Sequence, residues 1–444
     1  MPAGDTSWDK AVNANIQDDE WEDGVLAGDA SSEEREGRAP ALARAYRVIA
    51  DDLYGAIPVS RWAQSLLESP LFQRLDGVSL SDAPGESLFG RPFPSRLTHS
   101  LGVYYLARLA RPRDRALQAA ALAHDLGHGP FSHLTEPLMI ERIGLNHEQR
   151  SAALLREVVA RSQGQSARLV AWLDPDEARE LITGKSADGR GELLNGLLDY
   201  DNLDHVARFA LAAGLCEPGY DGLALARGLR VTTGADSAAH VTLADDLRDE
   251  ALRWQANRAV VFQFLQSDAW NVAAHAMLRK AIDLTARDGL LDDSFFDETD
   301  ADALRHLRRS PSSRALVERV LTQDPYEVIW EADAPPEQGE IAALFRSWRQ
   351  RLALEEQIAA ESGLRANELV ALYAVSRKAR PLPLAASQVN STILGPANEP
   401  PPERFVRILA PAGIGQDYIR RARMAAERAF SALGAIPRGW PELR

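Results

Sequence analysis

The stretch HDLGHGPFSH (124–133) decides the fold of this 444-residue chain. His124 and Asp125 are adjacent in it, and the segments RLTHSLG (96–102) and LLDYDNLDHVAR (197–208) supply the partners that such a pair needs. Five of the nine histidines of the chain fall within fifty residues around this stretch. Packing alone explains such a density of imidazoles poorly, and the pattern indicates a charged pocket built around a metal ion.

The candidate metal ligands are two histidines and two aspartates, namely His99, His124, Asp125 and Asp201. Adjacent residues of a helix point about 100° apart, so His124 and Asp125 reach one ion only at the edge of a helix. Distant residues must therefore complete the site, and Asp199 and Asp204 compete with Asp201 for the second carboxylate. This set of ligands suits one divalent cation, Mn²⁺, Fe²⁺ or Mg²⁺, with Zn²⁺ as a further candidate.

Other polar side chains near these ligands suit phosphate chemistry. Arg96 precedes His99 by three residues, so the two share a face if this turn is helical. A guanidinium at this place can hold a phosphate by two hydrogen bonds, although a plain surface arginine is the alternative. His128 and His133 follow the HD pair, and an imidazole near a phosphate can donate a hydrogen bond or transfer a proton near neutral pH. The alternative for both is a supporting or helix-capping role.

Four strings resemble the deoxynucleoside triphosphate (dNTP) triphosphohydrolase branch of the HD-domain metal-dependent phosphohydrolases. They are LFQRLDGVSL (71–80), SRLTHSLGVYYLARLA (95–110), LAHDLGHGPFSH (122–133) and HEQRS (147–151). The resemblance runs from about residue 51 to about residue 307. It implies a helical HD fold, one bound divalent metal, a nucleotide substrate and a homo-oligomer.

The same resemblance assigns roles to individual residues. It places Asp201 at the metal, with Asp199 and Asp204 in supporting positions, and it places Arg96 on a phosphate. It implies that His128 and His147 act around the catalytic water and the phosphates. It also implies that His133 contacts the substrate.

The chain departs from the family pattern on the sugar side of the site. Asn202 stands where the family usually has a lysine or arginine that touches a phosphate, and His205 stands where it usually has a tyrosine near the sugar. Phe209 replaces an aspartate that binds the sugar 3′-hydroxyl, and Ser79–Ser81 replace the sugar-reading glutamine and leucine. Because His205 lies four residues after Asp201, we expect it to face the pocket and contact the substrate.

Composition limits the class of protein. No run of eighteen apolar residues is present, so we expect no membrane helix, and the N-terminal stretch has neither the basic nor the apolar region of a secretory signal. The single cysteine, Cys216, excludes an internal disulfide and fits a reducing cytoplasm. The net charge of −14 gives no sign of nucleic-acid binding. We therefore expect a cytoplasmic protein.

The expected architecture is mainly α: an HD-domain helical bundle with a few short strands and a small C-terminal α+β segment. We divide the chain into an acidic, mobile segment (1–38), an HD-type phosphohydrolase domain (39–380, core about 51–310), a proline-rich linker (381–402) and a small β-α segment (403–444). Within the domain, apolar spacing predicts helices over 99–110, 114–124, 148–161, 192–199 and 202–213. A hairpin is expected around 228–245, a strand over 404–413 and a helix over 417–433.

The candidate metal ligands indicate a metal-dependent enzyme, and the resemblance implies a phosphohydrolase of nucleotides, with hydrolysis of a dNTP to deoxynucleoside and triphosphate as the first expectation. A different nucleotide in the same site, a monophosphate or a modified one, is the second. A catalytically silent nucleotide-binding protein is the third, and the complete set of metal ligands argues against it.

Overall fold

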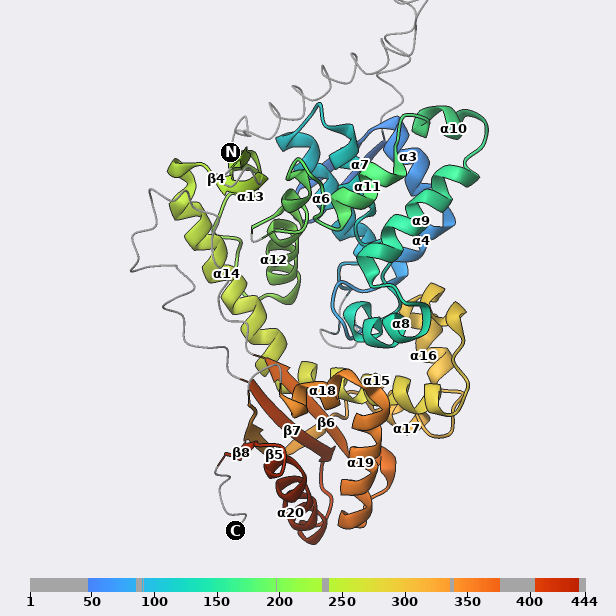
Figure 1. Cartoon of the computed structure of the whole chain (residues 1–444), viewed down its shortest axis with the longest axis vertical. Coiled ribbons are helices and arrows are strands. Elements are labelled where there is room, and N and C mark those ends of the chain that lie inside the picture. The colour runs from blue at the N-terminus through green and yellow to red at the C-terminus, as the bar shows by residue number, and fades with distance from the viewer. Residues whose placement is uncertain are drawn as a thin grey trace, which may run out of the picture.

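Figure 1 shows the computed structural model of the chain, in which helices predominate. The structure describes residues 47–84, 90, 92–196, 198–233, 239–335, 339–375 and 404–438. Within these ranges the protein is mainly α with small sheets only, which confirms the predicted fold class. The segments expected at 1–38 and 381–402 lie outside the described residues, and the predicted domain boundaries stay predictions.

The described chain begins with an antiparallel hairpin, β1 (Arg47–Asp51) and β2 (Gly55–Val59), and then runs through the helices of the upper half of Figure 1. These helices are α3 (Arg61–Leu67), α4 (Pro70–Arg74), α6 (Arg96–Ala110), α7 (Arg115–Ala123), α8 (Glu136–Ile143), α9 (His147–Arg161), α10 (Gly164–Val170), α11 (Pro175–Ile182), α12 (Tyr200–Ala213) and α13 (Gly222–Gly228). The hairpin β3 (Leu229–Thr233) and β4 (Ala239–Leu243) and the long helix α14 (Arg248–Ser267) follow.

α6 is the central helix of this half, and it is buried along almost its whole length. Its buried apolar residues join those of α3, α7, α9, α11 and α12 in one hydrophobic core. Gly102 allows α12 to approach α6 closely, because a Cβ at this position would lie 1.8 Å from Oδ2 of Asp204. This close approach brings the start of α12 next to the side chains of α6 that face the site.

The lower half of Figure 1 combines helices with a small sheet. Its helices are α15 (Ala269–Arg287), α16 (Asp300–Leu307), α17 (Arg314–Leu321), α18 (Glu340–Arg346), α19 (Trp348–Ser362) and α20 (Gln416–Ser431). The sheet has the order β6-β7-β5-β8, with β5 at Tyr326–Asp333, β6 at Val370–Val375, β7 at Arg404–Pro411 and β8 at Ile436–Pro437. Strand β7 follows the predicted linker, whereas β5 and β6 precede it. Because β7 pairs with both, the two parts of the chain share one sheet.

Most predicted elements are confirmed to within three residues at their ends, including α6, α7, α9, α12, the β3–β4 hairpin, β7 and α20. The predicted helix over 192–199 is wrong. Only a short 3₁₀ turn forms there, at Arg190–Leu193. The chain turns tightly at Gly196, where a Cβ would lie 2.2 Å from the carbonyl oxygen of Glu192. No helix of the described residues is long and apolar enough to span a bilayer.

Candidate active site

The loop after α7 presents the HD pair. His124 follows the last residue of α7, and its Nδ1 donates a hydrogen bond to the carbonyl of Ala121 at 2.8 Å. Ser151 of α9 donates from its hydroxyl to the carbonyl of His124 and accepts the N–H of Gly127. Gly127 is required here, because a Cβ would lie 2.1 Å from the carbonyl oxygen of His147. The contact with α9 therefore fixes the loop directly behind the pair.

α6 supplies the other histidine of the site. Ser95 caps this helix by accepting the N–H of Thr98, so the first turn, which holds Arg96 and His99, is ordered. His99 is fully buried, and its Nδ1 donates to Oδ1 of Asp204 at 2.7 Å. Arg96 and His99 lie on one face of the helix, as the spacing predicts.

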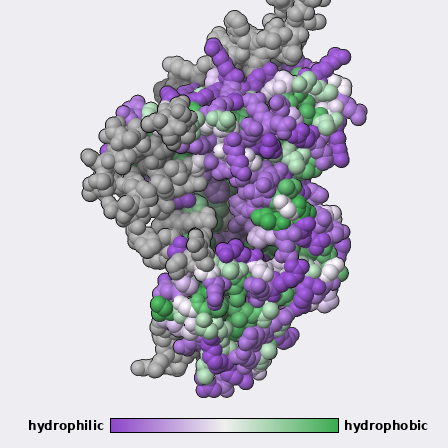
Figure 2. All heavy atoms as spheres, in the orientation of Figure 1, coloured by the Kyte–Doolittle hydropathy of each residue, from purple (hydrophilic) through white to green (hydrophobic). Residues whose placement is uncertain are grey.

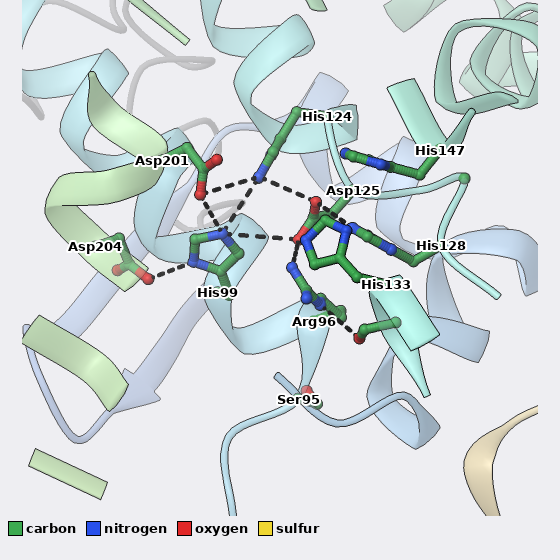
Figure 3. A network of polar contacts seen from close by, with 12 residues as sticks. Ser95, Arg96, His99, His124, Asp125, His128, His133, His147, Asp201 and Asp204 are labelled. Carbon is green, nitrogen blue, oxygen red and sulfur yellow. Dashed lines mark hydrogen bonds and ion pairs between the residues drawn. The ribbon is translucent and has the colours of Figure 1, made fainter. Parts of the chain in front are cut away.

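Figure 3 shows the four predicted metal ligands converging on one point. Nε2 of His99 lies 3.3 Å from Nε2 of His124 and 3.0 Å from Oδ1 of Asp201. Asp125 places Oδ1 3.4 Å from Nε2 of His124 and Oδ2 3.7 Å from Nε2 of His99. Ligand atoms of His99, His124 and Asp125 all lie within 4.8 Å of one another, and Asp201 adds its oxygen from the start of α12.

The protonation of these side chains fits a bound cation. Carbonyl and carboxylate oxygens only accept, so both histidines carry a proton on Nδ1 and, when neutral, present an Nε2 lone pair. The two Nε2 atoms lie 3.3 Å apart and face carboxylate oxygens. Their lone pairs repel one another unless a positive charge lies between them. Two nitrogens that each lie about 2.1 Å from a common ion are about 3 Å apart, so the spacing suits one divalent cation.

The electrostatics of the site also favour positive charge. Burial lowers the pKa of His99, but the hydrogen bonds to Asp201 and Asp204 outweigh it and raise this pKa to about 9. Burial raises the pKa of Asp125, yet His124 and Arg96 hold it well below its usual range. The pKa of Asp201 is likewise lowered, chiefly by His99 against the effect of burial. A bound dication replaces the proton that this arrangement attracts.

Arg96 lies against the HD aspartate. Its Nη1 donates to Oδ2 of Asp125 at 2.9 Å, and its Nε donates to Oγ of Ser132 at 2.9 Å. The side chain is 4% exposed. Neighbouring carboxylates, Asp125 first among them, outweigh burial and raise its pKa. The guanidinium is therefore charged and fixed at the edge of the ligand set.

A second cluster contains His128, His133 and His147, whose ligand atoms also lie within 4.8 Å of one another. The rings of His128 and His147 are stacked, with centroids 4.1 Å apart and planes 13° from parallel. An imidazole lone pair lies in the ring plane, so two parallel rings cannot both aim at one ion. Nitrogens of two nearly parallel rings instead suit hydrogen bonds to separate oxygens of one phosphate.

Glu136, at the start of α8, organises this second cluster. Its Oε1 accepts from Nδ1 of His147 at 2.6 Å, and its Oε2 accepts from Nδ1 of His133 at 3.2 Å. Burial lowers the pKa of His133, but the hydrogen bond to Glu136 outweighs it and the pKa is raised. Burial and Arg96 lower the pKa of His128. The cluster therefore pairs one histidine whose pKa is raised with one whose pKa is lowered.

Asn202, His205 and Phe209 stand at positions where the family contacts its substrate, and the structure places only His205 beside the predicted metal ligands. The amide of Asn202 donates to the carboxylate of Asp199, the N-cap of α12, and so is engaged within its own helix. His205 lies beside the ligands, with its ring 5.9 Å from that of His99. Phe209 is fully buried and packs edge-on against Phe93, so the structure gives its ring no exposed surface for a substrate.

The interpretation of the sequence missed Glu136 and Ser132, which support the histidines and Arg96. Glu136 follows His133 by three residues, a spacing that could have indicated the contact. Asp82 was also missed, and it accepts the N–H of His133 at 3.2 Å. Nothing local in the sequence marks Asp82, because the contact joins segments 51 residues apart.

Comparison with known proteins agrees with this geometry. Residues 96–213 match the family model described as "HD domain". The chain is 32% identical over 160 residues to the deoxynucleoside triphosphate triphosphohydrolase SAMHD1 of Bos taurus. The matched region makes up 31% of this chain and 27% of the relative. The human protein of the same name is 30% identical over 131 residues, or 26% of this chain and 21% of the relative. The uncharacterized protein YwfO of Bacillus subtilis is 32% identical over 140 residues, or 29% of this chain and 31% of the relative. The chain thus spans about a quarter of the length of the SAMHD1 relatives that it matches.

Proposed function

We propose, from the premise that residues 96–213 form an HD domain, that this protein is a metal-dependent phosphohydrolase of nucleotides and hydrolyses a dNTP to deoxynucleoside and triphosphate. The observation that carries the proposal is the convergence of His99, His124, Asp125 and Asp201 beside Arg96. These four residues would hold a divalent cation, which would supply Lewis acidity for attack of water at a phosphorus atom. The SAMHD1 relatives carry this activity in their name.

The chain's own residues divide the remaining work. Arg96 is charged and fixed, so it can hold a phosphate oxygen by charge-assisted hydrogen bonds. In the reaction, water attacks the α-phosphorus and the bond from this phosphorus to the 5′-oxygen breaks. The leaving 5′-oxygen needs a proton, and we assign its donation to His133, because the hydrogen bond to Glu136 raises the pKa of this histidine. His128 stays neutral, and with His147 it can accept a proton from water or donate to phosphate.

A different nucleotide in the same site is the second candidate. It is favoured by the residues that replace a phosphate contact and a sugar contact of the family, since Asn202 is bonded to Asp199 and Phe209 is buried. A homo-oligomer and a cytoplasmic location remain predictions. Manganese also remains a prediction, because the donor set admits several divalent ions.

Product analysis tests the proposal. Purified protein is freed of metal with a chelator and reloaded with Mn²⁺, Fe²⁺ or Mg²⁺, and each form is incubated with dNTPs, NTPs and deoxynucleoside monophosphates. Triphosphate together with deoxynucleoside supports the first candidate, whereas phosphate from a monophosphate supports the second. The Asp201→Ala variant is the control for chemistry at this site. Release of no product with any metal would contradict both candidates.

A further inference from the structure

Two consecutive residues directly before His133 have left-handed backbone. Phe131 has a φ of 59° and Ser132 a φ of 53°, and the only other non-glycine residue with positive φ among the described residues is Gln323. A residue with a Cβ rarely adopts this backbone conformation, because the Cβ crowds the carbonyl oxygen that follows it. Such strain persists only where surrounding contacts enforce it. Contacts from elsewhere in the protein must therefore hold this pair.

Asp300 makes the contact that holds Phe131. It is the first residue of α16 and is 7% exposed. Its Oδ1 accepts the N–H of Phe131 at 2.7 Å, and its Oδ2 accepts the N–H of Ser79 at 2.9 Å. One carboxylate thus joins the loop that carries the histidines to the segment that precedes α6. The carboxylate serves the two N–H donors with a separate oxygen for each.

Both joined segments lead to Arg96. Oγ of Ser132 accepts from Nε of Arg96 at 2.9 Å and donates to the carbonyl of Ser79 at 2.8 Å. The N–H of Arg96 donates to the carbonyl of Val78 at 2.8 Å, and Ser79 forms a β-bridge with Ser95. The backbone and the side chain of Arg96 are therefore both fixed by the two segments that Asp300 joins.

We propose that Asp300 is a positioning residue that sets the orientation of Arg96 toward the substrate. This inference rests on the proposed function, in which Arg96 binds a phosphate. Burial raises the pKa of Asp300 to about 6, against its two N–H donors, so the carboxylate is ionised at neutral pH and accepts through both oxygens. Other side chains secure the earlier part of the loop: Arg74 donates to the carbonyls of Leu126 and His128. The metal ligands are thus fixed independently of Asp300.

The Asp300→Asn variant tests this inference. Asparagine offers one acceptor oxygen and turns an amide N–H₂ toward the second N–H donor. We expect unchanged metal content and a fall in kcat/KM of roughly 10- to 100-fold, the size typical of a misplaced positioning group. In the Arg96→Ala background the same substitution should have almost no further effect. Asp302→Asn, an exposed change in the same helical turn, is the matched control and should keep the wild-type rate.

Two results would overturn the inference. One is a folded Asp300→Asn variant with the wild-type kcat/KM, and the other is a fall that recurs in full without Arg96. If Asp300→Asn does not fold, Ser132→Ala carries the same test, because Ser132 is the contact between the held loop and Arg96. A wild-type rate in Ser132→Ala then overturns the inference.

The test is separable from the proposed function. If the wild-type protein releases no product from any nucleotide, the proposed function fails. The affinity of the metal-loaded protein for inorganic triphosphate, measured by calorimetry, then decides the role of Asp300. Weaker binding by Asp300→Asn than by Asp302→Asn supports positioning, and equal binding contradicts it.

Discussion

Asp204 accepts a hydrogen bond from Nδ1 of His99 at 2.7 Å, whereas Nε2 on the other side of the ring faces the predicted metal ligand Asp201. Its carboxylate also receives two hydrogen bonds from Arg208, and Arg208 in turn pairs with Asp51. The contact fixes the tautomer and the ring orientation of His99, so that Nε2 faces Asp201. A carboxylate in this position raises the basicity of a histidine ligand.

The first prediction is that Asp204→Asn weakens binding of the divalent ion by about 10- to 100-fold, the range typical when such a supporting carboxylate is lost. Competition with a fluorescent chelator measures the affinity. Asp199→Asn is the matched control, because asparagine is also a good N-cap for α12 and should leave metal binding unchanged. An Asp204→Asn variant that binds the ion as tightly as the wild type would show that this contact does not support the ligand.

The second prediction is that Asp125→Ala removes most of the bound metal while the helical signal in circular dichroism remains. Asp125 is the carboxylate within the tight group of ligand atoms, so its removal takes away one of the four predicted donors. Metal content is measured by mass spectrometry after purification. Asp176→Ala, an exposed aspartate on α11, should retain full occupancy. Full occupancy in Asp125→Ala would refute the ligand assignment.

The third prediction is that Arg96→Ala weakens hydrolysis without emptying the metal site. Loss of one charge-assisted contact with a phosphate costs about 1.5–3 kcal/mol, or roughly a 10- to 150-fold fall in kcat/KM. Steady-state kinetics and metal content are measured on the same preparation. Unchanged kcat/KM on every accepted substrate would show that Arg96 serves only to pair with Asp125.

Local patterns were enough to predict the helices that carry most of the candidate site. His124 and Asp125 are adjacent, and the helix that carries His99 has a clear apolar spacing, so α6, α7 and α12 were predicted near their observed bounds. The proximity of Asp201 to His99 came from the resemblance, because 102 residues separate the two in sequence. The close approach of α12 to α6 depends on Gly102, whose role is visible only once both helices are placed.

The supporting contacts could not be predicted in the same way. Asp300 acts on Phe131 across 169 residues, and Asp82 acts on His133 across 51 residues. Isolated aspartates carry no periodic signal that would indicate such partners. Strands β5 and β6 were also missed, since short strands within a helical chain leave little pattern and their pairing with β7 is non-local.

The fourth prediction concerns pH and Asp300. Its pKa is raised from 3.8 to about 6, chiefly by burial, and the N–H donors, Arg96 and Arg74 offset this only in part. The folded state therefore binds the proton more tightly than the unfolded state. Protonation of Asp300 therefore stabilises the folded state, and this contribution to the free energy of unfolding is fully present below pH 3.8 and is lost as the pH rises through 6. The shift in pKa corresponds to a contribution of about 3 kcal/mol at most.

Urea unfolding of the metal-free protein between pH 4 and 7.5, with about half-unit steps, measures this effect against Asp300→Asn, which cannot titrate at this position. The stability of the wild type relative to the variant should decrease as the pH rises. Parallel pH curves for the two proteins would show that Asp300 keeps an ordinary pKa.

The last prediction concerns the sugar. Two of the positions that the resemblance assigns to the sugar hold Leu80 and Phe209, which are 1% and 0% exposed. An apolar pair cannot reward a hydroxyl group, whereas a site built to bind one discriminates strongly, because its polar groups are left unpaired by the wrong substrate. We therefore expect a preference for a dNTP over its 3′-deoxy analogue of less than about a hundredfold in kcat/KM, since a larger value corresponds to a lost buried hydrogen-bond pair. His205 stacks over Phe209 and lies beside His99, which makes it the polar side chain best placed to rebuild the contact. A preference above a hundredfold that disappears in His205→Ala would show that His205 binds the 3′-hydroxyl and that the apolar pair does not decide specificity.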